Sequence, residues 1–290
     1  MIKKGIILAG GMGTRMSPLT KAVNKQLLPL YDKPLIFYPI SVLMLAGIRR
    51  ILIIVNKGQL NQFRKILPEK NNLGISIEYK EQLKPEGLPQ AFTIGEKFIG
   101  KDNVALILGD NFFYGQSLTK ILKKNINLKS GAKIFLHPVR NPHFYGVATL
   151  DKNKKIASLI EKPKKTKSNL AVTGLYFFDN KVIEFTKKLK PSKRGELEII
   201  DLLKVYKKKS KLNVELIGRG GSWLDTGNIR DFYEASNFIA TIESRQGLKV
   251  ACLEEIALNN KWIKKKQLIE SIKFYGNCDY SKYLKLLSNV

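Results

Sequence analysis

Cysteine and histidine are scarce in this chain, with two of each among 290 residues. Cys252 and Cys278 have neither the spacing of a metal site nor the density of a disulfide framework, and such usage suits a reducing cytoplasm. His137 and His143 lack metal-type partners at useful spacing, and no Ser/His/Asp or Cys/His pattern stands out. We therefore expect a cytoplasmic protein whose chemistry does not depend on a catalytic histidine or a reactive thiol.

Long hydrophobic runs are also lacking. The longest, residues 34–48, contains tyrosine, proline and serine and falls short of the roughly 18 to 20 residues that span a bilayer. The apolar stretch that follows Lys3 and Lys4 is too short for the core of a signal peptide. We expect a buried helix at 34–48, no membrane-spanning segment and no secretion.

Negative charge is the third shortage, because 24 acidic residues face 51 basic ones and leave a net charge of +27. Such a balance is also found in nucleic-acid-binding proteins. The lysines are spread out, however, and the short runs at 162–167, 207–209 and 264–266 come without a basic helix, zinc-finger spacing or aromatic RNA-binding signature. Asparagine and isoleucine are abundant too, so a general compositional bias explains the charge more simply than a nucleic-acid-binding face does. We expect weak, salt-sensitive binding to polyanions and no specific nucleic-acid partner.

Eight short apolar runs have the character of β-strands, and helical patterns separate several of them. The expected strands are 5–8, 51–55, 75–79, 104–108, 132–136, 147–150, 171–178 and 214–216. The clearest expected helices are 34–46, 88–98, 118–125, 182–189 and 196–207. This alternation predicts an α/β fold with a mostly parallel, doubly wound sheet. In such sheets the ligand lies beyond the carboxyl ends of the strands.

The hydrophobic pattern of the sequence changes at about Asn228 and is helical from there on. Apolar residues from Phe232 to Ile242 are spaced for one long helix, and shorter helical patterns follow to the end of the chain. No flexible linker precedes this part. We therefore divide the chain into a core of residues 1–227 and a helical C-terminal part of residues 228–290, packed on the core.

A glycine-rich turn follows the first expected strand and is the most informative segment of the chain. Gly10, Gly11 and Gly13 free the backbone for positive φ and for close approach of a ligand, and their amides can converge on an anion. Arg15 and Lys25 would add positive charge. The order of residues fits neither a Walker loop nor the dinucleotide fingerprint. The turn is either a phosphate-binding loop or only a tight strand-to-helix connection.

Two aspartates are candidate magnesium ligands. Asp110 closes the strand 104–108 in a Gly-Asp-Asn turn, and Asp225 lies in the segment GSWLDTG. Magnesium usually takes one or two carboxylates together with substrate phosphate oxygens, so such a pair is sufficient. The alternatives are an aspartate that bonds its own turn and a helix N-cap before the long C-terminal helix.

Glu161 and Lys162 end an apolar segment and are followed by a proline. A glutamate beside a lysine could bind a sugar hydroxyl and a phosphate together, although a solvated charged loop is the simpler interpretation. Gln82, Gly87 and Tyr145 say little by themselves.

The combination of motifs resembles the sugar nucleotidyltransferases, and within them the glucose-1-phosphate thymidylyltransferase family, across nearly the full chain. The resemblance is carried by LAGGMGTRMSPLT, NKQLLP, EGLPQAF, LGDNFFYGQ, FYGV, EKPKKTKSNLAVTGLYFFD, RGELEIID, WLDTG and ACLEEIA. Gln26, which follows Lys25, is a discriminator, because relatives that use other nucleotides usually carry other residues there. The resemblance implies a Rossmann-like, mixed and mostly parallel sheet flanked by helices.

The resemblance also assigns residues. The nucleotide dTTP would be bound by Leu8, Gly10, Gly11, Gly13, Thr14, Arg15, Gln26, Gln82, Gly87 and Asp110. Glucose 1-phosphate would be bound by Asn111, Tyr145, Gly146, Glu161, Lys162, Val172, Thr173, Tyr176 and Trp223. The expected catalytic residues are Arg15, Lys25, Asp110, Lys162 and Asp225, with Asp110 and Asp225 on Mg²⁺.

The implied reaction is an in-line attack by a phosphate oxygen of glucose 1-phosphate on the α-phosphorus of dTTP, which releases pyrophosphate without a covalent enzyme intermediate. It is the first step of dTDP-sugar synthesis, for example of dTDP-rhamnose for cell-surface polysaccharide. The resemblance further implies a homotetramer and inhibition by a dTDP-sugar end product near the C-terminal helices. Met16, Asn24, Pro89 and 220–222 depart from the usual pattern, and the last forty or so residues diverge. A different base or sugar specificity, a silent sugar-nucleotide sensor and a basic nucleic-acid-binding protein remain as alternatives.

Overall fold

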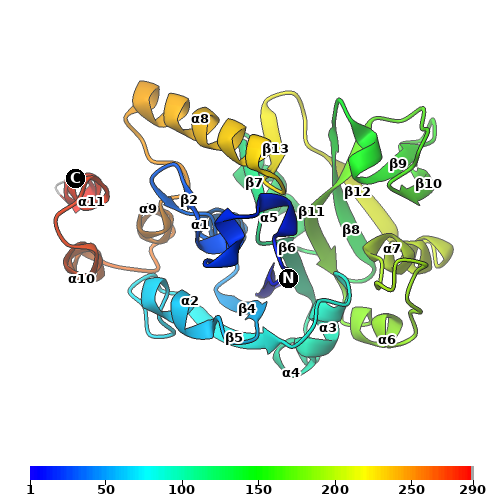
Figure 1. Cartoon of the computed structure of the whole chain (residues 1–290), viewed down its shortest axis with the longest axis horizontal. Helices are drawn as coiled ribbons and strands as arrows, with labels where there is room; N and C mark the ends of the chain where they lie inside the picture. The colour runs from blue at the N-terminus through cyan, green and yellow to red at the C-terminus, as the bar shows by residue number, and fades with distance from the viewer. Residues whose placement is uncertain (289–290) are drawn as a thin grey trace.

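A nine-stranded mixed sheet forms the centre of the molecule, which is described here for residues 1–288 from a computed structural model (Figure 1). Seven strands follow one another in the order β10 (Ile156–Glu161), β9 (Gly146–Leu150), β11 (Leu170–Phe178), β6 (Val104–Leu108), β1 (Lys4–Ala9), β4 (Arg50–Asn56) and β5 (Ser76–Gln82). Two more, β8 (Ala132–Pro138) and β12 (Leu212–Leu216), extend from β11. All eight expected strands are present, and the predicted fold class is confirmed.

The strands β6, β1, β4 and β5 run parallel, and this half of the sheet positions the site. Leu8 at the end of β1 is in register with Leu108 at the end of β6, and the Gly109 amide donates to the Leu8 carbonyl at 2.9 Å. The glycine-rich turn and the Gly109–Asp110 turn therefore leave the same edge of the sheet side by side, as the sequence predicted. The other half of the sheet, around β11, is largely antiparallel.

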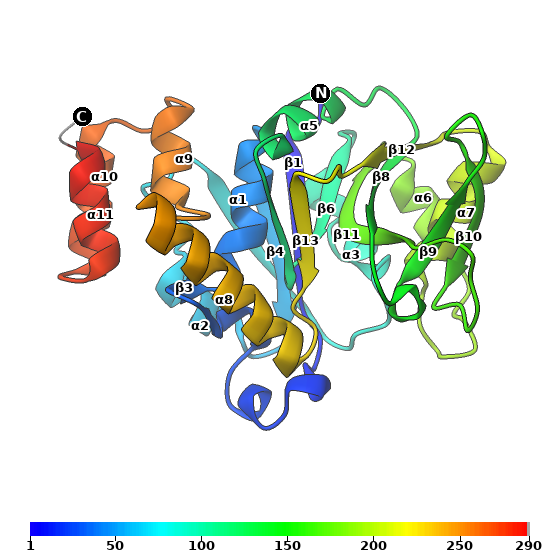
Figure 2. The ribbon, with the colours of Figure 1, turned by 90° about the horizontal axis from the view of Figure 1, so that it is seen from above.

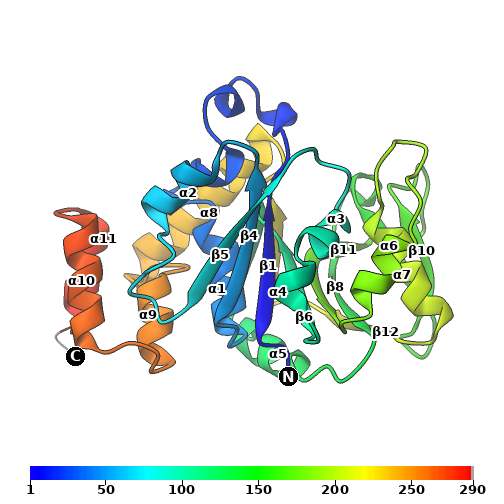
Figure 3. The ribbon, with the colours of Figure 1, turned by 90° about the horizontal axis from the view of Figure 1, so that it is seen from below.

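Helices cover both faces of the sheet because successive strand residues point to opposite sides (Figures 2 and 3). Ile7 and Ala9 pack into one hydrophobic cluster, whereas Ile6 and Leu8 pack into the other. The first cluster contains α1 (Phe37–Leu45), α2 (Leu60–Ile66), α5 (Leu118–Asn125) and α9 (Leu253–Asn259). The second contains α3 (Gln90–Ile94), α4 (Glu96–Ile99), α6 (Val182–Lys187) and α7 (Ile199–Lys208). The expected buried helix in 34–48 is α1, whose residues are buried over nearly its whole length.

Four expected helices differ from their predicted bounds: α1 begins only at Phe37, α6 ends at Lys187, and the patterns 88–98 and 196–207 differ for reasons that the packing explains. The pattern 88–98 divides into α3 and α4 at Gly95, where a Cβ would lie 2.8 Å from the Ile6 side chain and 2.9 Å from the Ala91 carbonyl oxygen. The pattern 196–207 begins as α7 only at Ile199, because Glu198 has an extended backbone and is bonded to Arg194. Close packing and a side-chain contact, which hydrophobic spacing does not report, decide both boundaries.

Short elements absent from the sequence prediction complete the site. A two-stranded antiparallel ribbon joins β7 (Asn111–Gly115) to β13 (Gly221–Asp225), with Asp225 directly opposite Asn111. A small hairpin of β2 (Pro29–Leu30) and β3 (Lys33–Pro34) follows the glycine-rich turn. The ribbon brings Asp110 and Asp225, which are far apart in the sequence, to one place.

The C-terminal part is helical, as predicted. It consists of α8 (Ile229–Gln246), α9, α10 (Lys265–Tyr275) and α11 (Asp279–Ser288). The N-cap of α8 is Asn228, whose side chain accepts from the Asp231 amide at 3.0 Å, so Asp225 is not the cap residue. Leu253 and Ala257 of α9 join the core of the sheet, while α10 and α11 pair at the edge of the molecule farthest from β10 (Figure 2). The division at residue 227 stays a prediction.

None of the helices in the described residues 1–288 is both long enough and apolar enough to cross a membrane.

Candidate active site

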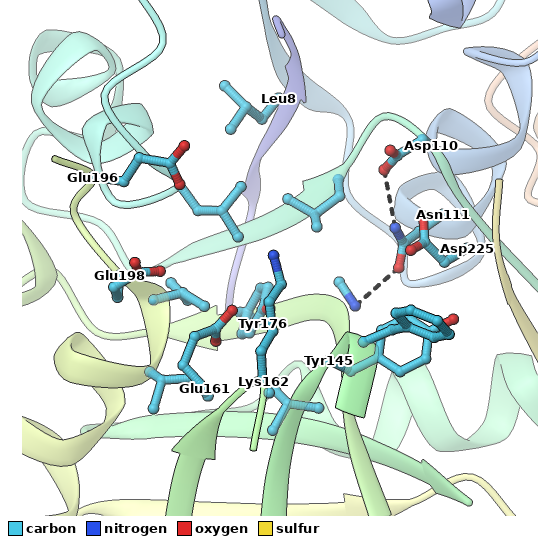
Figure 4. Close-up of a pocket in the computed structure, with 18 of the residues that line it drawn as sticks. Leu8, Asp110, Asn111, Tyr145, Glu161, Lys162, Tyr176, Glu196, Glu198 and Asp225 are labelled. Carbon is cyan, nitrogen blue, oxygen red and sulfur yellow. Dashed lines mark hydrogen bonds between the residues drawn. The ribbon is translucent and has the colours of Figure 1, made fainter. Parts of the chain in front are cut away.

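A cavity of about 300 Å³ opens at the carboxyl ends of β1 and β6 (Figure 4). Its walls come from the first glycine turn, the ribbon β7–β13, the strands β9 to β11 and the segment that leads into α7. The structure places these predicted residues on its lining: Leu8, Gly10, Arg15, Gln26, Asp110, Asn111, Tyr145, Gly146, Glu161, Lys162, Val172, Tyr176, Trp223 and Asp225. Segments that span more than 200 residues of sequence therefore meet in one hollow.

Hydrogen bonds hold the glycine-rich turn on both sides. The Gly11 amide donates to Asn56 Oδ1 at 2.9 Å, and Asn56 Nδ2 donates to the Gly11 carbonyl at 2.9 Å. Gly13 has φ 58° and its carbonyl accepts from the Thr20 hydroxyl at 2.8 Å, just before a 3₁₀ turn at Thr14–Met16. A Cβ on Gly10 would clash with the Gln82 side chain. The glycines thus serve a fixed, closely packed loop.

Lys25 and Asp110 form a part-buried ion pair behind the cavity. Asn24 caps the 3₁₀ turn Lys25–Leu27 by accepting from the Gln26 amide at 2.8 Å, which fixes the lysine on its short element. Burial alone would raise the pKa of the Asp110 carboxyl, but the Lys25 ammonium and the Asn111 amide outweigh it and hold that pKa below its ordinary value. Asp110 is therefore kept ionised.

Asp225 has the opposite shift. Burial and then the charge on Asp110 raise the pKa of Asp225 to about 7, although Lys25 and Arg15 act against them. The pair holds more negative charge than its two neighbouring cations stabilise. Its hard carboxylate oxygens, facing a cavity, fit a divalent cation such as Mg²⁺, which keeps water ligands and needs few protein ones. No three His, Cys, Asp or Glu side chains gather into a cation site within residues 1–288.

Gln26 has an acceptor without a partner. Its Oε1 is buried and makes no hydrogen bond, while the residue lines the cavity. An unsatisfied buried amide oxygen is costly, so it suits a ligand that brings an N–H group.

Another part of the cavity wall combines aromatic rings with charged side chains. The Tyr145 and Trp223 rings meet edge to face at 5.1 Å. Burial, followed by the charge of Glu198, raises the pKa of Glu161. Lys162, at φ 41°, reaches into the cavity beside Glu161 (Figure 4).

Several predicted residues lie outside the lining. Gln82 is buried and donates to Gln90, and Gly87 bridges to Leu197 at φ 107°. Four more predicted residues belong to the glycine-rich turn and the segment after it and do not line the cavity: Gly11, Gly13, Thr14 and Lys25. Thr173 is fully buried and its hydroxyl donates to the Phe135 carbonyl at 3.0 Å, so its side chain points away from the cavity that Val172 and Gly174 line.

The cavity also contains residues that sequence reasoning missed. They are Leu88, Leu108, Phe144, Gly174, Arg194, Glu196, Leu197, Glu198, Ile199 and Ile200. Arg194 is the most consequential, since it donates to both carboxylate oxygens of Glu198 at 2.9 Å and lies 3.7 Å from Glu161. The RGELEIID segment was the available signal, because it is one of the motifs that carry the family resemblance, but none of its residues was assigned to the site.

A larger cleft of about 820 Å³ shares Arg15, Phe144, Tyr145 and Asp225 with this cavity. The two hollows together provide room for an extended ligand. A glycine loop with an arginine, two carboxylates of which one is bound to a lysine, and a Glu–Lys pair in the same cavity are features of an enzyme that transfers a nucleotidyl group between phosphates.

Comparison with known proteins agrees with this class. The sequence pattern of the nucleotidyl transferase family matches residues 4–242. Relatives named glucose-1-phosphate thymidylyltransferase are 51% identical over 281 residues in Neisseria meningitidis (97% of this chain, 98% of the relative) and 49% over 286 in Xanthomonas campestris (99% and 97%). The chain belongs to the nucleotidyl transferase family and is a member of its glucose-1-phosphate thymidylyltransferase group.

Solved structures give the same result. A Bacillus anthracis protein assigned to the glucose-1-phosphate thymidylyltransferases and crystallised with sucrose matches at a TM-score of 0.75 and 40% identity, over 81% of this chain and 94% of that one. A UDP-glucose pyrophosphorylase bound to UDP-glucose matches at 0.73 and 28%, over 83% and 100%. The predicted family and the predicted enzyme class are confirmed.

Proposed function

We propose that this enzyme transfers the thymidylyl group of dTTP to α-D-glucose 1-phosphate, giving dTDP-glucose and pyrophosphate. The observation that carries the proposal is the single cavity in which Arg15, the Asp110–Asp225 pair and the Glu161–Lys162 pair face one space. A nucleotide at the glycine loop and a sugar phosphate at Lys162 would then meet beside Asp110. The relatives named for this reaction support the same substrates.

The reaction needs positioning and charge neutralisation rather than a base. The phosphate of the sugar is already ionised at neutral pH, and one of its oxygens attacks the α-phosphorus as pyrophosphate leaves. Arg15 and the loop amides are placed to hold the departing pyrophosphate, and Lys162 is placed to hold the sugar phosphate. Lys25 keeps Asp110 ionised in its ion pair. These four groups bring two polyanions together despite their repulsion.

Mg²⁺ is proposed as the cofactor because Lys25 and Arg15 do not offset the effect of burial and of the neighbouring Asp110 on the Asp225 carboxyl. Asp110 and Asp225 would hold it, and when bound it would neutralise charge on the phosphates. The test that does not depend on turnover is a rise in unfolding temperature of the substrate-free enzyme with added Mg²⁺, absent in Asp225→Asn.

Gln26 and Gln82 are proposed to recognise the base. The unpartnered Gln26 Oε1 can accept the N3–H of thymine, whereas cytosine presents an acceptor at that position. Uracil offers the same N3–H, so the amide selects thymine and uracil together against cytosine.

One assay tests the function and its specificity. Pyrophosphate release would be measured with dTTP, UTP, dCTP and ATP, each against glucose 1-phosphate, mannose 1-phosphate and galactose 1-phosphate. The proposal predicts the highest kcat/KM for dTTP with glucose 1-phosphate. A higher value for UTP or for another sugar would reassign the specificity, and release in no combination would refute the transferase.

The assembly, regulation and location remain proposals that follow from the family resemblance. A homotetramer would be detected by sedimentation velocity, and end-product inhibition by a dTDP-sugar added to the assay. Salt-sensitive, sequence-independent binding to DNA is expected from the +27 net charge, and a tight specific complex would contradict it. Fractionation of the source cells would test the cytoplasmic location. A silent sensor is disfavoured because Arg15, Lys162 and both aspartates are present.

A further inference from the structure

Asn111 is a buried polar side chain at the site whose amide group has protein partners at both its oxygen and its nitrogen. It is 1% exposed and makes three hydrogen bonds with three different segments. Its Oδ1 accepts from the Trp223 indole N–H at 2.6 Å and from the Gly174 amide at 2.9 Å. Its Nδ2 donates to Asp110 Oδ1 at 3.1 Å (Figure 4). The side chain thus connects the wall of the cavity to the carboxylate that faces the cavity.

The orientation of this amide is fixed by its partners. An indole N–H and a backbone N–H can only donate, so both require an acceptor and hold the Asn111 oxygen toward them. The nitrogen must then face Asp110. Gly174 permits this approach, because a Cβ at that position would clash with Asn111 Oδ1.

The Asp110 carboxylate is consequently held at both oxygens. Oδ1 accepts from Asn111, and Oδ2 accepts from Lys25. The backbone is fixed as well, since the Asp110 carbonyl accepts from the Thr226 amide at 3.0 Å and from the Thr226 hydroxyl at 2.8 Å. Asn111 also pairs with Asp225 across the ribbon, which places it between the two aspartates.

We propose that Asn111 is a positioning residue, oriented by Trp223 and Gly174, that holds the Asp110 carboxylate in the direction required for catalysis. This role goes beyond the sugar contact expected from the sequence and rests on the proposed transferase function. The Nδ2 group carries a second hydrogen, which remains available for the sugar contact, so the effect on Asp110 is additional to any effect on binding.

The test is Asn111→Asp. The new carboxylate still accepts from Trp223 and Gly174, so the buried donors stay satisfied, but an oxygen replaces the nitrogen that faced Asp110. Attraction becomes repulsion at the contact with Asp110, while the partners of Asn111 Oδ1 are kept. We expect kcat to fall by about a hundredfold because the reacting centre is misplaced. The dissociation constant for dTDP-glucose should change by less than about tenfold, because ground-state binding loses one N–H contact to the sugar at most.

Asn125→Asp is the matched control. Asn125 lies on α5, away from the cavity, and is also buried. Its Nδ2 also donates to a carboxylate, Glu215 Oε2, at 3.0 Å. It carries the same chemical change, with Lys133 beside the new carboxylate, and kcat should stay within about twofold of the wild type.

Three outcomes overturn the role of Asn111. They are an unchanged kcat in Asn111→Asp, a weakened dTDP-glucose affinity with kcat retained, and a crystal structure of the variant in which the Asp110 carboxylate has not moved. The structural readout does not require activity, so a wild-type enzyme that makes no dTDP-glucose refutes the proposed function and leaves this inference to be judged separately.

Trp223→Phe tests the positioning role of Asn111 if Asn111→Asp does not fold. It keeps the aromatic wall and removes one donor to Asn111, so kcat should fall about tenfold with product affinity largely kept. The crystal structure should show the Asn111 side chain turned from its wild-type position. An Asn111 and Asp110 arrangement identical to the wild type, at full kcat, would contradict the proposal.

Discussion

Asp110, which immediately precedes β7, and Asp225, at the end of the paired strand β13, have opposite pKa shifts. Lys25 and Asn111 overcome the effect of burial and lower the pKa of Asp110, whereas burial and the charge of Asp110 raise the pKa of Asp225 to about 7. The first carboxylate is fixed and ionised, and the second lacks a full counter-charge. This asymmetry leads to predictions for stability as well as for turnover.

Asp225→Asn should stabilise the cation-free protein at high pH. Because its pKa is raised in the folded state, native Asp225 binds a proton that the unfolded chain releases, and stability falls as pH rises from about 4 to about 7. At pH 8 the variant should exceed the wild type by on the order of 2 kcal/mol, and the two should converge near pH 4. Urea midpoints across this pH range, without divalent cations, measure the difference. A wild type as stable as the variant at pH 8 would disprove the shift.

Lys25→Met should instead destabilise the protein at high pH. It leaves the Asp110 carboxylate part-buried without its cation, which costs about 3 kcal/mol at pH 8. The lowered pKa means that this stabilisation is lost as pH falls, so the variant and the wild type should approach one another in acid. The exposed pair Lys187–Glu96 gives the control, and Lys187→Met should cost less than about 1 kcal/mol. Equal losses for the two variants would argue against a structural role for the buried pair.

Much of this architecture could be predicted from the sequence, and the limits have physical causes. The strands 5–8 and 104–108 were identifiable because they are continuous apolar runs, and they placed the glycine turn and Asp110 correctly. The ribbon β7–β13 could not be predicted, because its strands are short and pair residues about 110 positions apart, as in Asp225 with Asn111. Thr173 was expected in the pocket, but strand alternation turns its side chain away.

Gln26→Leu should impair nucleotide recognition selectively. It removes the buried acceptor while keeping similar bulk, and the KM for dTTP should rise about thirtyfold as the N3–H loses its partner. The KM for glucose 1-phosphate should stay nearly constant. Gln62→Leu, on the exposed face of α2, is the control and should behave as the wild type. A rise confined to the sugar substrate would assign Gln26 elsewhere.

Glu243→Ala should loosen the C-terminal helices. Glu243 is buried on α8, 3.1 Å from both Lys33 and Lys249, and accepts from the Val250 amide at 2.8 Å. Its removal leaves buried positive charge and should cost about 3 to 5 kcal/mol in unfolding free energy. Glu234→Ala, on the same helix but in an exposed pair with Arg230, should cost less than about 1 kcal/mol. Similar unfolding curves for the two variants would count against the buried cluster.

The most direct test of the central claim is the stoichiometry of products from dTTP, glucose 1-phosphate and Mg²⁺, followed by ³¹P NMR, with Asp110→Asn and Lys162→Ala as comparison variants. The account predicts dTDP-glucose and pyrophosphate in equal amounts, formed only when both substrates are present. It also predicts turnover lowered by at least about a hundredfold in each variant while both remain folded by circular dichroism. Hydrolysis of dTTP without glucose 1-phosphate, or wild-type rates in the two variants, would contradict it.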